Sequence, residues 1–433
     1  MPRPTVLIVG GGFAGLEAAR ALKDADANIT LLDRSNHHVF QPLLYQVATA
    51  ALSPANIAAP IRKILARQAN TRVLLAEATA VDARARVLRT TAGDLPYDYL
   101  VLAAGATHSY FGNEGWGEHA PGLKSIDDAL AIRKRILLAF EEAEQETDPD
   151  RQAESLTFVL VGAGPPGVEM AGAIKEIAVE SVPRDFRNVD TTRARVILLE
   201  AADRVLPQYP EDLSEHAETS LRELGVDVRT NAMVTDITDR SVTYKDPNDD
   251  SDEPATTTIP TRRVVWAAGV KGAPLLESLG TELDRAGRAA VERDLSVPGH
   301  PRVFCVGDLM HHEDPETGEP TPGVAQGAMQ SGKFVGRLIA RELRAGSNRR
   351  PERPAFRYDN KGEMATIGRA RAVADIKGLH ITGFAAWVAW TVVHLLFLIG
   401  FRNKVLAMLE WAWLYAFWSR GARLITGHKP KHD

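Results

Sequence analysis

Thr5-Val-Leu-Ile-Val-Gly10-Gly-Gly-Phe-Ala-Gly15 decides the fold of this chain, because an uninterrupted apolar run passes directly into a glycine-rich turn. The spacing Gly10-x-Gly12-x-x-Gly15 is typical of a strand, a tight turn and a helix in succession. The first glycine permits the turn, the second lets a pyrophosphate approach the backbone, and the third lets helix and strand pack closely. The next apolar run, Asn28–Asp33, ends on an acid suited to a ribose hydroxyl. The stretch therefore predicts a βαβ unit that binds a dinucleotide, with the phosphates at the helix N-terminus.

A second copy of this pattern lies near the middle of the chain, as Gly162-x-Gly164-x-x-Gly167 with Pro166 near the helix start. The next apolar run ends on Glu200, which would bond the ribose diol of NADH and repel the extra phosphate of NADPH. Arg204 lies close enough in sequence to leave that preference open. Two such sites need two dinucleotides, and FAD with a nicotinamide is the usual pair for hydride transfer.

The chain length, net charge and cysteine count limit the possible domain organisation and functions. A chain of 433 residues is too long for one core and should divide into two or three domains. The formal net charge of −5 argues against a nucleic-acid surface. A single cysteine, Cys305, excludes a disulfide framework, a zinc cluster and a dithiol shuttle. No presequence precedes the first strand, so we expect a cytoplasmic enzyme body.

Further strands end at Ala104-Gly105 and at Ala268-Gly269, and another covers residues 302–308. A helical pattern follows from Ala325 to about Arg344, and the polar, proline-rich residues 346–354 form a connector. The fold class is therefore α/β, with two Rossmann-like dinucleotide-binding domains and a helical C-terminal segment.

Two polar loops resemble metal sites without completing one. Residues 246–254 place oxygen ligands at the first, third and fifth positions of a calcium loop, but Ser251 replaces its glycine and Thr257 its glutamate. We interpret this loop as a solvated hairpin tip. His311-His-Glu-Asp314 is likewise more typical of solvated histidines than of a metal site, and we expect no bound metal.

The C-terminus differs in kind from the rest of the chain. Residues 384–401 carry no formal charge, and a second apolar run is interrupted only by Glu410. The segment is compatible with a transmembrane hairpin, an interfacial anchor or a dimer-forming core element. Trp411, Tyr415 and Trp418 lie on one helical stripe, and basic residues accompany it, which favours helices lying in the cytoplasmic leaflet. These basic residues are Arg402, Lys404, Arg420, Arg423, Lys429 and Lys431.

The paired glycine turns resemble those of the two-dinucleotide-binding flavoproteins of the glutathione-reductase fold, and within that fold the chain is most similar to the type II NADH dehydrogenases. Four segments carry the resemblance: residues 38–48, 162–169, 325–330 and 377–425. It implies an FAD-binding domain of residues 1–112 and 300–344, an NADH-binding domain of residues 113–299, a connector of residues 345–378 and membrane-anchoring helices in residues 379–433.

The resemblance also implies the site residues. FAD would contact Gly10, Gly11, Gly12, Phe13, Ala14, Gly15, Asp33, Arg34, Ala78, Ala104, Gly105, Asp308, Ala325 and Gln326. NADH would contact Gly162, Gly164, Pro166, Gly167, Glu200, Ala268 and Gly269. Glu169 would position the nicotinamide or relay protons, and Lys377 would contact the flavin. Gln326 and Gln330 share a helix face and would bond the quinone carbonyl oxygens. Without the resemblance, we would interpret them as ordinary polar residues on an exposed helix surface.

The implied function is NADH:quinone oxidoreduction through FAD, without proton pumping, by a homodimer bound peripherally to the cytoplasmic face of the cell membrane. The quinone would be ubiquinone or menaquinone. Because no reactive cysteine pair is present and Cys305 is expected to be a small buried hydrophobe, electrons should leave the flavin directly. Two alternatives remain: a soluble NADH:ferredoxin-type or apoptosis-factor-like reductase, which has no use for the tryptophan-rich tail, and a flavin redox sensor that reduces no quinone.

Overall fold

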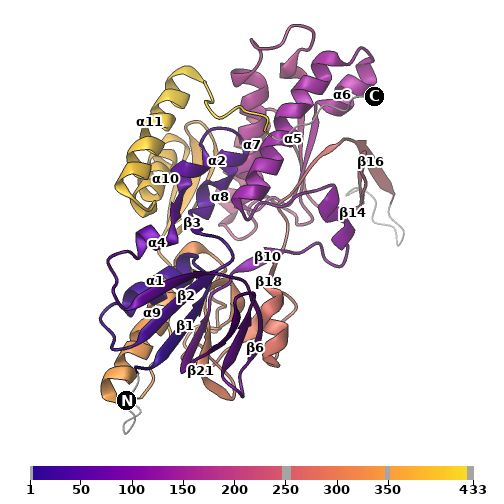
Figure 1. Cartoon of the computed structure of the whole chain (residues 1–433). Coiled ribbons are helices and arrows are strands. Elements are labelled where there is room, and N and C mark those ends of the chain that lie inside the picture. Colours follow the sequence, from indigo (N-terminus) through magenta and orange to yellow (C-terminus); the bar gives the residue numbers. More distant parts are fainter. Residues whose placement is uncertain (1–2, 246–254, 347–351, 427–433) are drawn as a thin grey trace. The chain divides into compact units, whose positions relative to one another are not determined.

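The computed structural model describes residues 3–245, 255–346 and 352–426, which form two compact units (Figure 1). Residues 246–254, which we expect to form a solvated hairpin tip, lie outside the described residues. The first unit comprises Met1–Val39, Ala58–His108 and Val270–Asn360. The second unit comprises Phe40–Ile57, Ser109–Gly269 and Lys361–Asp433.

The first unit is built on a six-stranded sheet in the order β20-β21-β9-β1-β2-β5. Its strands are β20 (Ser296–Val297), β21 (His300–Cys305), β9 (Tyr99–Leu102), β1 (Thr5–Val9), β2 (Asn28–Asp33) and β5 (Thr71–Leu75). All pairings are parallel except that of β20 with β21. The central strands are almost continuously buried, as expected for a parallel sheet covered on both faces. The carboxyl ends of the parallel strands meet at one edge, where ligands bind in such sheets.

Helices α1 (Phe13–Ala21) and α9 (Ala325–Ala345) pack against each other in this unit. They cross at a distance that only glycine permits. A Cβ at Gly332 would lie 2.0 Å from the carbonyl oxygen of Ala14. A Cβ at Gly336 would lie 2.6 Å from that of Ala18. The helix expected from Ala325 is confirmed, and its glycines hold it against the helix that follows the first glycine turn.

Smaller strands complete the first unit. An antiparallel sheet contains β6 (Ala78–Asp82), β7 (Val87–Thr90) and β8 (Gly93–Pro96). Three strand pairs are β10 (Ala106–His108) with β18 (Val270–Gly272), β3 (His37–Val39) with β4 (Ala58–Pro60), and β19 (Ala289–Ala290) with β22 (Met310–His311).

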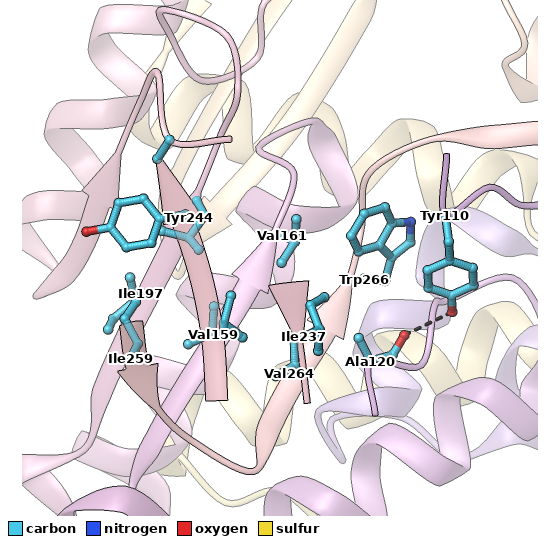
Figure 2. Packing of buried hydrophobic residues seen from close by; sticks show 13 residues of the cluster. Tyr110, Ala120, Val159, Val161, Ile197, Ile237, Tyr244, Ile259, Val264 and Trp266 are labelled. Atoms are coloured by element: carbon cyan, nitrogen blue, oxygen red, sulfur yellow. Dashed lines mark hydrogen bonds between the residues drawn. The ribbon is translucent and has the colours of Figure 1, made fainter. Parts of the chain in front are cut away.

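The second unit repeats the architecture with a parallel sheet in the order β13-β12-β11-β17. These strands are β13 (Val226–Arg229), β12 (Arg195–Leu199), β11 (Thr157–Val161) and β17 (Arg263–Trp266). Its helices include α5 (Ile126–Gln145), α7 (Pro165–Glu176) and α8 (Glu211–Glu223). Figure 2 shows apolar side chains of this sheet packed against a three-stranded sheet of β14 (Val234–Ile237), β15 (Ser241–Lys245) and β16 (Thr256–Pro260). This cluster fixes the strands that carry the second glycine turn.

The C-terminal part of the second unit contains an antiparallel sheet followed by two apolar helices. The strands are β23 (Glu363–Gly368), β24 (Arg371–Ile376) and β25 (Leu379–Thr382), and the helices are α10 (Gly383–Phe397) and α11 (Phe401–Phe417). Two short helices from the N-terminal part of the chain, α2 (Leu44–Ala48) and α3 (Pro54–Ile57), belong to the same unit. No helix in the described ranges combines the length and apolarity needed to cross a bilayer.

The two units divide the chain differently from the four expected domains. Residues 270–299 join the first unit, because β18 pairs with β10 and β20 pairs with β21. Residues 40–57 join the second unit, where α2 packs on α5 and α7, and α3 packs on α11. The C-terminal segment from residue 361 is likewise part of the second unit, since β23 packs on α7. Pairing partners distant in sequence therefore set these boundaries.

Candidate active site

The first glycine turn forms an open cradle at the end of β1. Gly10 has φ +103°, and a Cβ there would lie 2.2 Å from the carbonyl oxygen of Ala103. A Cβ at Gly15 would lie 1.8 Å from the carbonyl oxygen of Gly10. In contrast, a Cβ at Gly12 would meet no atom within 4 Å. The fold itself therefore requires Gly10 and Gly15, whereas Gly12 keeps open the space that a pyrophosphate would enter.

Asp33 is fixed beside this turn by two backbone hydrogen bonds. Its Oδ2 accepts the N–H of Gly11 at 2.6 Å, and its Oδ1 accepts the N–H of Ser35 at 2.6 Å. Each carboxylate oxygen keeps a further acceptor site for a ribose hydroxyl. Arg34 is exposed next to it, and Ala78 begins β6.

A late segment of the chain returns to the same cradle within the first unit. Gly307, at φ +65°, donates its N–H to Oγ of Ser331 at 3.0 Å. A Cβ at Gly307 would lie 3.4 Å from that of Ala14. Asp308 follows at the end of β21, near Gly323 and close in sequence to the start of α9, where Ala325 and Gln326 lie. The region around Ala14, the Gly307-Asp308 turn and α9 are thus adjacent, as the FAD assignment requires.

The second glycine turn repeats the first in the other unit. Gly162 has φ +98°, and a Cβ there would lie 2.7 Å from the backbone nitrogen of Ala268. A Cβ at Gly167 would lie 1.9 Å from the carbonyl oxygen of Gly162. The nearest atom to a Cβ at Gly164 is Cδ of Pro166, at 4.0 Å. The open position is again the middle glycine, so this turn also fits a dinucleotide pyrophosphate.

Glu200 accepts backbone N–H groups beside the second cradle in the same way as Asp33 does beside the first. Its Oε2 accepts the N–H of Ala163 at 2.6 Å, and its Oε1 accepts the N–H of Ala202 at 2.9 Å. Arg204 instead donates from Nη2 to the carbonyl oxygen of Pro207 at 3.2 Å. The charged group bonded to the second glycine turn is therefore the carboxylate of Glu200.

Glu169 lies on α7, one turn beyond the second cradle, and is only 8% exposed. Burial raises its pKa well above the ordinary value, and favourable interactions with the Thr366 backbone N–H and the Trp390 indole oppose this only in part. A cavity of about 30 Å³ adjoins it, also lined by Tyr45 and Tyr415. That volume has room for about two water molecules. The site therefore places a buried carboxyl group, whose raised pKa favours the protonated form, beside a small polar cavity.

A buried ion pair borders the same cavity, and sequence reasoning did not find it. Arg420 donates from Nη2 to Oε2 of Glu176 at 3.2 Å and from Nη1 to the carbonyl oxygen of Thr49 at 3.0 Å. The other oxygen of Glu176 accepts the N–H of Arg369 at 2.6 Å. Burial raises the pKa of Glu176 and lowers that of Arg420, while their mutual attraction opposes both shifts. The only sequence signal was an arginine next to an apolar helix, which we assigned to the membrane side.

That assignment is wrong for two of the basic residues and for the aromatic stripe. Arg420 is buried, and Arg423 pairs with Asp185, so both tie the C-terminal segment to its own unit. Trp411 is buried and donates its indole N–H to Oε1 of Gln46 at 2.6 Å. Tyr415 packs edge-on against Trp387, with ring centroids 4.7 Å apart. Trp411 and Tyr415 of the expected lipid-facing stripe therefore contact the protein, and the guanidinium carbon of Arg369 lies 4.6 Å from the centroid of the Trp418 ring.

Other side chains of these helices are the ones that face outward. Exposed apolar residues lie along both helices. On α10 they are Phe384, Val388, Val392, Leu396 and Phe397, and on α11 they are Phe401, Met408, Leu409, Trp413 and Phe417. Many exposed apolar side chains on two neighbouring helices are typical of an interaction with a membrane or a partner.

The two glutamines of α9 differ in their surroundings. The amide of Gln330 pairs with the backbone of Asp359: its Nε2 donates to the carbonyl oxygen at 2.9 Å, and its Oε1 accepts the N–H at 3.0 Å. Gln326 is the second residue of the helix. Lys377 lies in the turn between β24 and β25, with φ 55° and an exposed side chain. The quinone and flavin contacts assigned to these residues stay predictions.

Two further expectations concern Cys305 and the adjacent histidines. Cys305 is fully buried in β21, and burial raises the pKa of its thiol to about 12, so it offers no thiolate at neutral pH. The expectation of solvated histidines is wrong for His312, which is buried with its Nδ1 3.0 Å from Oγ1 of Thr321. Within the described parts of the chain, no group of three or more His, Cys, Asp or Glu side chains is arranged to hold a metal ion.

Sequence comparisons match this arrangement over nearly the whole chain. Residues 4–332 match the family model of pyridine nucleotide-disulphide oxidoreductases, and residues 360–419 match that of the NDH2 C-terminal domain. The type II NADH:quinone oxidoreductase Ndh of Mycobacterium tuberculosis is 48% identical, over 98% of this chain and 90% of that protein. An internal alternative NAD(P)H-ubiquinone oxidoreductase of Arabidopsis thaliana is 28% identical, over 96% of this chain and 84% of that protein.

Solved structures share the fold at lower identity. The structure of NDH2 from Plasmodium falciparum in complex with NADH matches with a TM-score of 0.87 at 19% identity, covering 95% of this chain and 98% of that one. The sulfide:quinone oxidoreductase of Aquifex aeolicus matches with a TM-score of 0.73 at 20% identity, covering 96% of this chain and 95% of that one. The two family models together thus cover both cradles and the two C-terminal helices.

Proposed function

This chain belongs to the type II NADH:quinone oxidoreductases, and on that premise we propose how its residues divide the work. It is a flavoprotein that oxidises NADH and reduces a quinone. We assign FAD to the cradle of Gly12 and Asp33, and NADH to the cradle of Gly164 and Glu200. The observation that carries this assignment is the repeated geometry of the two turns. In each turn there is free space beside the second glycine of the motif, Gly12 or Gly164, and one acid is fixed by a backbone N–H of the turn.

FAD, when bound, supplies the hydride acceptor, and the protein supplies binding and proton control. Asp33 and Glu200 each offer carboxylate oxygens to a ribose diol, while the N-termini of α1 and α7 favour the pyrophosphates. Glu169 is buried in the unit to which we assign NADH, and its raised pKa suits it to accept or release a proton when the charge nearby changes. Cys305 takes no part, because its thiol is buried and protonated.

For the quinone we propose Gln326 as the principal amide donor, at the start of α9. A helix N-terminus also favours the negative charge that develops on a reduced ring. Gln330 lies on the same face, but its amide must first break its two hydrogen bonds to the backbone of Asp359 before it can bond a quinone oxygen. Its first role is to hold the backbone of Asp359 against α9.

The exposed apolar faces of α10 and α11 support peripheral binding to the cytoplasmic leaflet, where the quinone is dissolved. Apolar side chains that enter the acyl boundary bind a membrane without crossing it. Lys404 donates to the carbonyl oxygen of Leu396 at 2.6 Å, and Arg402 is exposed at the start of α11. The homodimer stays a prediction.

The experiment that tests this function follows the two half-reactions separately. NADH should bleach the flavin of the purified, FAD-loaded protein, and a short-chain quinone should restore the oxidised spectrum. Gln326→Leu should slow reoxidation by quinone, because a lost hydrogen bond of about 0.5–1.5 kcal/mol weakens binding roughly two- to tenfold. Gln330→Leu, which also breaks the two hydrogen bonds to Asp359, shows whether the second amide contributes to quinone reduction. Flavin that NADH reduces but quinone never reoxidises would favour the redox sensor over the enzyme.

A further inference from the structure

Phe111 has an unusual backbone and an unusual exposure for its residue type. Its φ is +53°, a left-handed value that large side chains rarely adopt, and its side chain is 69% exposed. Gly112, with φ +93°, continues the left-handed turn. Such strain persists only where the surrounding structure imposes it, and it concentrates at functional sites.

A buried aromatic cluster imposes this conformation. Trp266, at the end of β17 and 3% exposed, lies with its ring centroid 6.1 Å from that of Phe111. Its indole N–H donates to the carbonyl oxygen of Ser109 at 2.9 Å. Tyr110 packs on Trp266 at 5.1 Å and donates its hydroxyl to the carbonyl oxygen of Ala120, as Figure 2 shows. The residues on the N-terminal side of Phe111 are thus anchored, and its own ring is left projecting.

The ring projects over the backbone that borders the second cradle. A Cβ at Gly269 would lie 2.4 Å from Cζ of Phe111, so Gly269 has to be a glycine for the ring to occupy this place. The N–H of Ser109 donates to the carbonyl oxygen of Gly269 at 3.3 Å, which ties the two segments together. The residue before Gly269, Ala268, is the one that the Gly162 turn touches. Phe111 therefore lies close to the cradle wall, within the same unit.

The strand order shows which half of the dinucleotide lies on this side. In the order β13-β12-β11-β17, Glu200 follows β12, and under the proposed assignment it would bond the ribose of the adenosine half. The pyrophosphate would then lie at the Gly164 turn, which follows β11. The other half must then extend toward the end of β17, where Gly269 and Phe111 lie.

We propose that the exposed face of the Phe111 ring forms the wall on which the nicotinamide half of NADH packs. This inference rests on the proposed assignment of NADH to the second cradle. An aromatic ring stacks favourably on a flat heteroaromatic ring in an offset or edge-on geometry. Packing there would bury an aromatic surface that is otherwise exposed and would position the ring that carries the hydride. Phe111 is in this reading a binding residue for the nicotinamide and has no contact with the adenosine half.

ADP-ribose separates this role from a purely structural one, because it contains the adenosine half and the pyrophosphate but no nicotinamide. In the FAD-loaded full-length protein, Phe111→Ala should raise the Kd of NADH, taken from the saturation of stopped-flow flavin reduction, about two- to tenfold. The Ki of ADP-ribose as a competitor of NADH should stay unchanged. Phe111→Tyr should restore NADH binding, while Phe111→Leu, which keeps apolar bulk without an aromatic ring, should restore it only in part.

The outcomes that overturn the proposal are specific. Equal losses of NADH and ADP-ribose binding in Phe111→Ala would mean that the ring supports the cradle as a whole. Unchanged NADH binding would mean that the nicotinamide lies elsewhere. Failure of the underlying assignment looks different: wild-type flavin would not be reduced by NADH at all, before any variant is made. Melting temperatures should be similar among the variants, because the side chain is largely exposed.

Discussion

At the scale of single residues, one carboxylate organises each cradle. Asp33 and Glu200 both accept a backbone N–H from inside the glycine turn and another from the residue two positions further along the chain. The same group therefore fixes the turn and, in the proposed assignment, would present negative charge to a bound ribose. A 2′-phosphate at that position would be repelled by the carboxylate in either cradle. In the second cradle this repulsion would disfavour NADPH relative to NADH.

Glu200→Gln should reduce the preference for NADH over NADPH. The amide oxygen can still accept the N–H of Ala163, whereas the N–H of Ala202 loses its acceptor, so the variant removes the charge and one backbone hydrogen bond. Loss of a charge-assisted hydrogen bond of about 1.5–3 kcal/mol should lower kcat/KM for NADH at least tenfold, while that for NADPH rises. Asp203→Asn, at an exposed neighbouring acid, is the control. An unchanged ratio of the two kcat/KM values would reassign the ribose contact.

Glu169 couples its proton to stability. Its native pKa is raised above the ordinary 4.5 by burial, so the native state binds more protons than the unfolded state once the pH exceeds that value. The contribution to stability is then fully present below about pH 4.5 and is lost as the pH rises through the native pKa.

Glu169→Gln should flatten this pH dependence. From pH 5 to 8 the melting temperature of wild-type protein should fall relative to that of the variant, by up to the equivalent of about 1.4 kcal/mol per pH unit. Differential scanning calorimetry of both proteins at matched ionic strength measures the difference. Parallel curves would show that Glu169 titrates normally. The variant should also change the pH profile of quinone reduction if the carboxyl relays protons.

At the scale of elements, the segment after α11 is held by two arginines in different environments. Arg420 is buried against Glu176 and Thr49, whereas Arg423 pairs with a half-exposed Asp185. Removing one partner of a buried pair leaves the other charge uncompensated, which is far more costly than removing an exposed pair. The buried pair therefore carries most of the attachment of this segment to α7.

Arg420→Met should destabilise the second unit by about 3–5 kcal/mol, because Glu176 keeps its burial and loses its counter-charge. Arg423→Met, three residues further along, should cost about 0–1 kcal/mol. Thermal unfolding followed by circular dichroism compares the two variants directly. Similar losses in both would indicate that the Arg420 site admits water or that Glu176 becomes protonated without cost.

At the scale of the whole molecule, the C-terminal helices have two opposite roles. Their inner side contributes Trp390 and Trp411 to the second unit, and the outer side exposes an apolar surface. Removing residues 379–433 would therefore strip buried side chains from that unit, and loss of membrane binding after such a truncation would be ambiguous. Charge substitutions on the outer side test the anchor in a chain that keeps its core.

Leu396→Glu combined with Trp413→Glu should release full-length protein from vesicles that contain anionic phospholipid. Each change removes an apolar side chain worth about 1.5–3 kcal/mol when buried, so vesicle partitioning should fall at least tenfold per site. Leu75→Glu combined with Met233→Glu, at exposed apolar positions outside these helices, is the control. Vesicle flotation together with flavin absorbance reads both binding and folding. Undiminished flotation of the first pair would place the membrane contact elsewhere.

The sequence by itself determined both cradles and the α9 helix. Each depends on residues within a few turns of one another: a strand's apolar run, glycines that a turn demands, and an acid at the next strand end. Such patterns are local, so they survive without knowledge of packing. The assignment of the tail as helical and apolar was local in the same sense.

Only the tertiary structure decided which face of α11 is buried, that Arg420 pairs with Glu176, and that Phe111 covers Gly269. These partners are separated by more than a hundred residues in sequence, and a helix in which aromatic residues occur on every side gives no local sign of its inner face. The stripe of Trp411 and Tyr415 was equally compatible with lipid and with protein. Gln46 and Trp387 decided between them, because a buried indole N–H needs an acceptor and an aromatic ring packs best against another.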